Sequence, residues 1–159
     1  MTSAIDQLDL EILERLQEDS RASVQALGDD IGLSSASVHR RIKRLRDIGV
    51  IRAEPSVLDV RKIAPCMTLI VTVEIGVEAA HLCDAFKKKI AGFDEVQQAY
   101  HASGNMDFVL ILKVRDMAHY EQFAARAFYS DSNVRRFKTS VVLSEVKTGL
   151  SLPLRALLE

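Results

Sequence analysis

The first third of the chain has hydrophobic residues at helical spacing in three successive segments. Residues 6–18 predict an amphipathic helix, because apolar side chains recur there three or four positions apart. A second helix is predicted after its N-cap Ser23, and a third runs from its N-cap Ser34 to Gly49. The side chains expected to face inward are Ile5, Leu8, Ile12, Leu13 and Leu16, then Val24, Leu27 and Ile31, then Val38, Ile42, Leu45 and Ile48.

Gly32 separates the second and third helices, and glycine tolerates the left-handed conformation that such a turn requires. Two helices joined by a short turn containing glycine are typical of a helix-turn-helix, whose second helix lies in the major groove of DNA. The pattern therefore predicts a DNA-binding domain over residues 1–52.

Helical periodicity then disappears. Residues 50–59 predict a short strand and turn, which would form a small wing beside the third helix. Residues 53–66 contain Pro55 and Pro65 and are interpreted as a linker with a short strand.

The second half alternates between strands rich in β-branched residues and amphipathic helices. Strands are predicted over residues 67–75, 95–103, 107–115 and 135–147, and helices over residues 78–91 and 117–129. This β-α-β-β-α-β order is the ferredoxin-like arrangement, so the chain is predicted to be an α+β protein with a second domain over residues 67–159. Two helices cover one face of such a sheet. The other face also carries apolar residues, which predicts a homodimer.

The distribution of charge changes the picture. The net charge is −1, but residues 1–31 hold eight acids and two bases, whereas residues 33–52 hold six bases and one acid. A basic run on the helix that enters the groove is the electrostatic signature of phosphate binding, and hydroxyl and guanidinium groups can read base edges. The residues predicted to contact double-stranded DNA are Ser34, Ser35, Ser37, His39, Arg40, Arg41, Lys43 and Arg44.

Composition excludes several classes of function. No apolar run is long enough to span a bilayer, and no secretion signal precedes the first helix. Cys66 and Cys83 form no CxxC pair and are interpreted as small buried side chains in a reducing cytoplasm. We find no phosphate-binding loop, no GxSxG motif and no cluster with metal-ligand spacing, so neither an enzyme, a cofactor nor a metal site is expected.

The whole chain resembles the Lrp/AsnC family of transcription regulators. The resemblance rests on LQEDSRASVQAL and IGLSSASVHRRIKRLRDIGVI in the first half, and on GNMD (104–107), TSVVLSEVK (139–147) and SLPL (151–154) in the second. It implies a winged helix-turn-helix followed by a ligand-sensing domain. It also implies dimers that assemble into tetramers or octamers, and a cytoplasmic, nucleoid-associated regulator of amino-acid-related metabolism.

The resemblance further implies that an amino-acid effector binds near the turn between the second and third strands of the sheet. The alternative is a purely structural role, in which Gly-x-x-Asp only forms a favourable hairpin turn. Three departures from the common family pattern are Met106, Ala53-Glu54 after GVIR, and Ile63-Ala64-Pro65 at the end of the linker. The residues predicted to bind the effector, with the last four alongside on neighbouring strands, are Gly104, Asn105, Met106 and Asp107, then Tyr100, Ser103, Thr139 and Ser140.

Two alternatives remain open from the sequence. A sirohaem decarboxylase, a tetrapyrrole enzyme, resembles paired chains of this architecture, and His101 before the turn keeps that hypothesis open. A metabolite-binding module with a vestigial DNA-binding domain is the second alternative. The intact bases of the predicted DNA-binding helix, over residues 39–46, argue against both.

Overall fold

A computed structural model describes residues 5–158 of the chain. It divides into two compact units: the residues up to Val57 together with those from Lys147 form the first, and Leu58–Val146 forms the second. The predicted division assigned all of residues 67–159 to the second domain. The structure instead places the end of the chain in the first unit. No helix within the described residues is long and apolar enough to cross a membrane.

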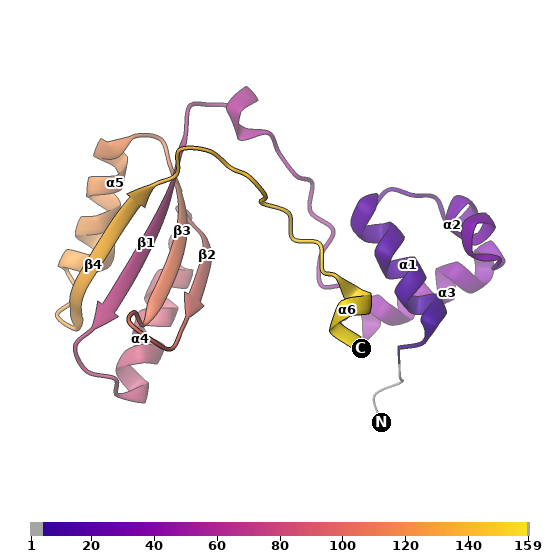
Figure 1. Cartoon of the computed structure of the whole chain (residues 1–159), viewed down its shortest axis with the longest axis horizontal. Helices are drawn as coiled ribbons and strands as arrows, with labels where there is room; N and C mark the ends of the chain where they lie inside the picture. Colours follow the sequence, from indigo (N-terminus) through magenta and orange to yellow (C-terminus); the bar gives the residue numbers. More distant parts are fainter. Residues whose placement is uncertain (1–4, 159) are drawn as a thin grey trace. The chain divides into compact units, whose positions relative to one another are not determined.

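The first unit is built on three helices, α1 (Gln7–Glu18), α2 (Val24–Ile31) and α3 (Ser35–Asp47) (Figure 1). The predicted caps are confirmed, because the Ser23 hydroxyl accepts a hydrogen bond from the Ala26 N–H at 3.1 Å and the Ser34 hydroxyl accepts one from the Ser37 N–H at 3.3 Å. Each hydroxyl satisfies a backbone donor that would otherwise have no partner at a helix start.

The core of this unit agrees with the predicted helical stripe in all three helices. Its buried cluster consists of Ile12, Leu27, Val38 and Ile42, and Leu45 is also fully buried. The prediction was wrong at Ile5, which is 36% exposed and precedes the start of α1. It was also wrong at Ile48, which is 43% exposed because α3 ends at Asp47 and the chain turns away from the helix there. In α1 the fully buried positions are Asp9 and Ile12, and the burial of a charged residue was not expected.

A short helix near the end of the chain, α6 (Leu154–Leu158), lies against α1. The Arg155 guanidinium donates to both carboxylate oxygens of Glu14 at 2.9 Å. The backbone of Leu152 exchanges two hydrogen bonds with the side-chain amide of Gln17. This helix was not predicted, because five residues are too few to show helical periodicity.

The second unit is a four-stranded antiparallel sheet with two helices (Figure 1). Its elements are β1 (Met67–Ile75), α4 (Ala80–Ala91), β2 (Val96–His101), β3 (Phe108–Val114), α5 (Met117–Ala124), which continues as a π-helical turn (Ala125–Tyr129), and β4 (Val134–Val141). The strand order is β2-β3-β1-β4, so the predicted ferredoxin-like arrangement is confirmed.

Side chains from β1 and β3 alternate between a buried face and a half-exposed face. The buried face packs against α4 and α5, and Phe86, Phe123 and Phe128 are its large aromatic members. The opposite face, which no element of the second unit covers, carries Ile70, Val109 and Ile111. This uncovered face is apolar at its centre, as the sequence predicted.

The predicted wing is wrong for the single chain. Residues 52–59 form no strand, and the only regular element between α3 and β1 is a short 3-10 helix (Val60–Lys62). Val57 is 98% exposed and Pro55 lacks an N–H, so this segment has neither a partner strand nor a buried face. The last strand is also shorter than predicted, because β4 ends at Val141 rather than at residue 147.

Candidate functional site

Two glycines shape the turn between α2 and α3. Gly32 has a φ of 71°, in the left-handed region, and ends α2. Gly28 lies directly under the turn, because a Cβ added there would be 2.4 Å from the carbonyl oxygen of Leu33. The Leu33 N–H in turn donates to the Gly28 carbonyl at 2.9 Å. The helix-turn-helix predicted from Gly32 is therefore confirmed, with a second glycine that the sequence pattern did not single out.

The outer face of α3 presents exposed side chains opposite its buried stripe. Val38, Ile42 and Leu45 hold the helix against the core. His39, Arg40 and Lys43 are exposed on the other side, at the three- and four-residue spacing of one helix face. Lys43 also forms an ion pair with Asp47, one turn further along, at 2.8 Å. The structure therefore brings together three of the residues predicted to contact DNA.

The other predicted DNA-contacting residues have partners within the first unit. The Arg41 and Arg44 guanidinium groups point to α1, where they form ion pairs with Asp9. The Ser35 hydroxyl donates to the Gln25 side chain of α2 at 2.6 Å. Ser34 caps α3, and Ser37 is half-buried at the start of the same helix.

The turn between β2 and β3 holds the residues predicted to bind an effector. Gly104 has a φ of 122° with no other atom near its Cβ position, so the backbone conformation itself favours glycine. The Asp107 carboxylate accepts a hydrogen bond from the Ile75 N–H at 2.7 Å, which ties the turn to the end of β1. Ser103, Gly104 and Asn105 are exposed, and Met106 is half-buried. Asp107 therefore has a structural partner beside the predicted role in ligand binding.

The predicted placement of Thr139 and Ser140 beside this turn is wrong within one chain. They lie on β4, which is at the edge of the sheet opposite to β2, roughly 14 Å away across three strand spacings. The Thr139 hydroxyl contacts the Tyr120 hydroxyl under α5. Burial raises the pKa of Tyr120 despite this bond. Tyr100 does lie on β2 near the turn, half-exposed, with its hydroxyl donating to Gln98 at 2.9 Å.

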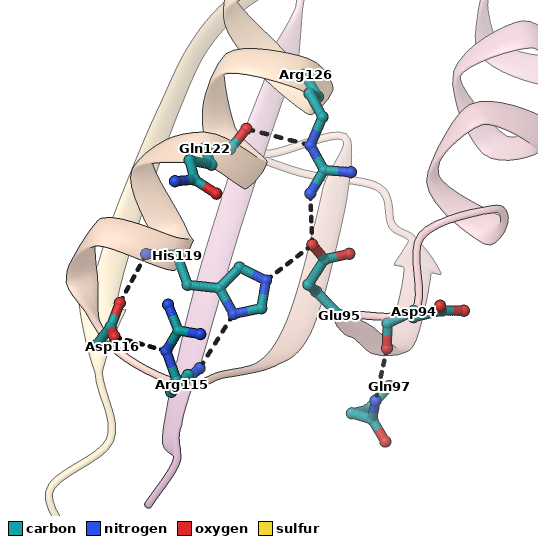
Figure 2. A network of polar contacts seen from close by, with 8 residues as sticks. All are labelled: Asp94, Glu95, Gln97, Arg115, Asp116, His119, Gln122 and Arg126. Carbon is teal, nitrogen blue, oxygen red and sulfur yellow. Dashed lines mark hydrogen bonds and ion pairs between the residues drawn. The ribbon is translucent and has the colours of Figure 1, made fainter.

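Sequence reasoning missed a polar network around Glu95, just before β2 (Figure 2). Its Oε1 lies 3.1 Å from His119 Nε2 and 2.5 Å from Arg126 Nη2, both on the helical segment after β3. The Arg115 N–H donates to His119 Nδ1, so the ring proton is on Nε2 and points at Glu95. Figure 2 shows the His119 and Arg126 side chains converging on one carboxylate oxygen of Glu95.

This network connects the start of β2 to the helical segment after β3. Burial alone would raise the pKa of Glu95, but a backbone hydrogen bond and the bonds from Arg126 and His119 outweigh burial and hold that pKa below its usual value. The partners are separated by 24 and 31 residues, so no local sequence pattern could have predicted them. The network fixes the helix after β3 against the sheet edge.

The residues considered for other chemistry are not arranged as a reaction centre. The His101 ring stacks on Phe108 with centroids 4.7 Å apart. Within residues 5–158, no three His, Cys, Asp or Glu side chains gather as metal ligands would. Cys83 is buried as predicted, and Cys66 is half-buried.

Comparison with known families agrees with this two-part organisation. Residues 5–46 match the AsnC-type helix-turn-helix domain, and residues 68–152 match the Lrp/AsnC ligand binding domain. The chain belongs to the Lrp/AsnC family. The two matches appear in the order that the sequence predicted, and together they cover both halves of the chain.

Relatives of this Lrp/AsnC protein are similar over nearly their whole length. An uncharacterized HTH-type transcriptional regulator of Sinorhizobium fredii is 37% identical over 94% of this chain and 89% of its own. The crystal structure of an AsnC family transcriptional regulator from Agrobacterium tumefaciens has a TM-score of 0.87 at 31% identity, and covers 95% of this chain and 98% of its own. A Neisseria meningitidis transcriptional regulator in complex with L-Met also has a TM-score of 0.87, at 28% identity, with 97% and 99% covered.

This Lrp/AsnC protein is therefore a DNA-binding transcriptional regulator. The families and relatives that it matches are regulators, not enzymes, so the tetrapyrrole enzyme considered from His101 is excluded as its class. The helix-turn-helix match includes nearly all of α3, which argues against a vestigial DNA-binding domain.

Proposed function

We propose that this regulator recognises specific DNA sequences through the outer face of α3, acting at the nucleoid on genes of amino-acid-related metabolism. An amino acid bound near the Gly104 turn, at an interface between chains, modulates its DNA binding. The proposal of an amino-acid effector rests on the L-Met complex of a Neisseria meningitidis relative, which is 28% identical over almost all of this chain.

The exposed side chains of α3 support the DNA half. His39, Arg40 and Lys43 share one face of a helix that the turn at Gly32 presents for insertion in the major groove. Arginine and lysine can both bond phosphates there, and arginine can also bond guanine. A homodimer presents two such faces, so the expected target is a palindrome with half-sites about one helical turn apart, or a multiple.

The geometry of the β2–β3 turn supports the effector half. The exposed backbone around Gly104 can approach a small ligand closely, and backbone N–H groups bind carboxylates. Since β4 lies at the far edge of the sheet from β2, Thr139 and Ser140 would complete such a site only from another chain. This supports a site formed in a tetramer or octamer rather than in one protomer.

The test is binding of the full chain to the DNA upstream of its own gene, against random DNA of equal length, with each of the twenty amino acids. We expect preference for the upstream DNA at ~150 mM salt and a changed affinity with one or a few amino acids. Equal weak binding to both DNAs in all conditions would contradict sequence-specific regulation of this gene.

Two matched variants separate the halves of the proposal. Arg40→Ala is expected to weaken binding to both DNAs, whereas Lys88→Ala, which removes an exposed base on α4, is expected to change neither. Gly104→Val is expected to abolish the amino-acid response while retaining DNA binding, because a β-branched residue cannot readily adopt a φ of 122°. An unchanged response in this variant would refute the proposed effector site.

A further inference from the structure

Among its described residues, the first unit contains one buried charged side chain, which lies against the DNA-binding helix α3. Asp9, in the first turn of α1, is 0% exposed, and it is the only buried polar residue among residues 5–158. It forms a reciprocal capping box with Asp6, since each carboxylate accepts a hydrogen bond from the other residue's N–H, at 2.9 and 3.1 Å. A buried charge is strongly unfavourable unless it is paired, so its partners decide whether it can be tolerated.

Both further partners come from α3. Arg41 Nη1 donates to Asp9 Oδ1 at 2.8 Å and also to both carboxylate oxygens of Asp6, at 2.9 and 2.7 Å. Arg44 Nη2 donates to the other oxygen, Asp9 Oδ2. The two guanidinium groups lie three residues apart, so they meet one carboxylate from successive positions on one side of the helix. Only 24% of Arg41 and 30% of Arg44 is exposed.

The contacts keep Asp9 ionised. Burial alone would raise the pKa of Asp9, but the hydrogen bonds from Arg44, the Asp6 backbone and Arg41 outweigh burial, so the pKa is lowered. Two positive charges of the basic helix are thus opposed by a fixed negative charge inside the same unit. The apolar core holds α3 against α1 without a directional preference, whereas these hydrogen bonds fix its rotation about its own axis.

We propose that Asp9 is a positioning residue for DNA recognition, which fixes the outer face of α3 in rotation and withholds Arg41 and Arg44 from the DNA phosphates. The basic segment of the sequence then contains two functional sets. His39, Arg40 and Lys43 form the set directed at DNA, and the two arginines form the set directed at α1. This rests on the proposed function, since it presupposes that the outer face of α3 contacts DNA.

The experiment is a salt titration of DNA binding by the full chain. The probe is the upstream duplex or, if none is preferred, the random duplex of equal length. Each lost phosphate contact makes the negative slope of log affinity against log salt shallower by about 0.9. Arg40→Ala should make the slope shallower by that amount, whereas Arg41→Ala and Arg44→Ala should leave it at the wild-type value. The ratio of upstream to random affinity should nevertheless fall about tenfold in both, because the helix face is misoriented.

Asp9→Asn provides the converse result. It keeps the size of the side chain but removes the negative charge that holds the two arginines against α1, so the slope should become steeper and random-DNA affinity should rise while specificity falls. A purely structural loss would lower both affinities. If Asp9→Asn does not fold, as judged by circular dichroism, the two arginine variants decide alone.

The outcomes separate this inference from the proposed function. The salt slope could become shallower in Arg41→Ala and Arg44→Ala, as in Arg40→Ala. These arginines would then contact phosphate, and the inference would be overturned. A slope unchanged in Arg40→Ala would instead overturn the proposed DNA-binding face, and the role of Asp9 with it.

Discussion

In each unit one carboxylate binds partners that are distant in the sequence, and Glu95 gives the clearest test in the second unit. Its side chain is 11% exposed and binds His119 and Arg126. Glu95→Gln removes the charge but retains an acceptor, so we expect the free energy of unfolding at pH 7 to fall by on the order of 1–3 kcal/mol. The variant is compared with wild type by urea unfolding followed with circular dichroism.

The pH dependence has a defined sign. The pKa of Glu95 in the folded chain lies below its ordinary value of 4.5, so its contribution is complete above pH 4.5 and is lost as pH falls through the lower folded value. The difference between wild type and Glu95→Gln should therefore be constant at pH 6–7 and shrink below pH 4.5. Glu121→Gln, on the exposed side of α5, is the control and should show no such difference.

At the scale of elements, the turn between α2 and α3 depends on a close approach of two backbones. An alanine Cβ at position 28 would be 2.4 Å from the Leu33 carbonyl oxygen, and backbone cannot yield as a flexible side chain can. We expect Gly28→Ala to destabilise the first unit by about 1–3 kcal/mol and to abolish DNA binding. Gly49→Ala meets no atom and should lose only about 1 kcal/mol through its φ of 76°, with DNA binding retained. Thermal unfolding and DNA titration of both variants check this.

The helices and strands with long periodic segments could be predicted from sequence, because burial of one face imposes a local repeat. The stripe of Val38, Ile42 and Leu45 predicted α3 and its core contacts correctly. What could not be predicted depends on partners distant in sequence. In the sequence, Asp9 is one of eight acids in residues 1–31. Its burial could not be predicted, because its partners Arg41 and Arg44 lie over 30 residues away.

The candidate site shows the same limit. Arg44 was grouped with the DNA-facing bases because basic residues on one helix cannot be told apart by spacing alone, and its ion pair with Asp9 was not expected. Thr139 was placed near the Gly104 turn, but strand order, which is not a local property, sets β4 at the opposite edge. The predicted wing over residues 50–59 needs a partner strand, and the chain by itself supplies none within its described residues.

At the scale of the whole molecule, the uncovered face of the sheet is the feature that a single chain leaves unsatisfied. Ile70 and Ile111 lie opposite each other in the register of β1 and β3, and Val109 lies beside them. Ile70 remains 37% exposed at the centre of the sheet, where a folded monomer would normally bury apolar surface. The proposed homodimer would cover this face with the same face of a second copy.

Ile111→Lys tests this arrangement, because it places a charge at the centre of the face while the helix-covered core stays intact. Sedimentation should show a dimer for wild type and a monomer for the variant, and circular dichroism should show the same secondary structure. Val77→Lys, at an exposed position after β1, is the matched control and should remain dimeric. Loss of the dimer should weaken binding to a palindromic target far more than to a single half-site, since linked sites bind with a high effective concentration. A variant that still sediments as a dimer would show that the chains pair through another surface.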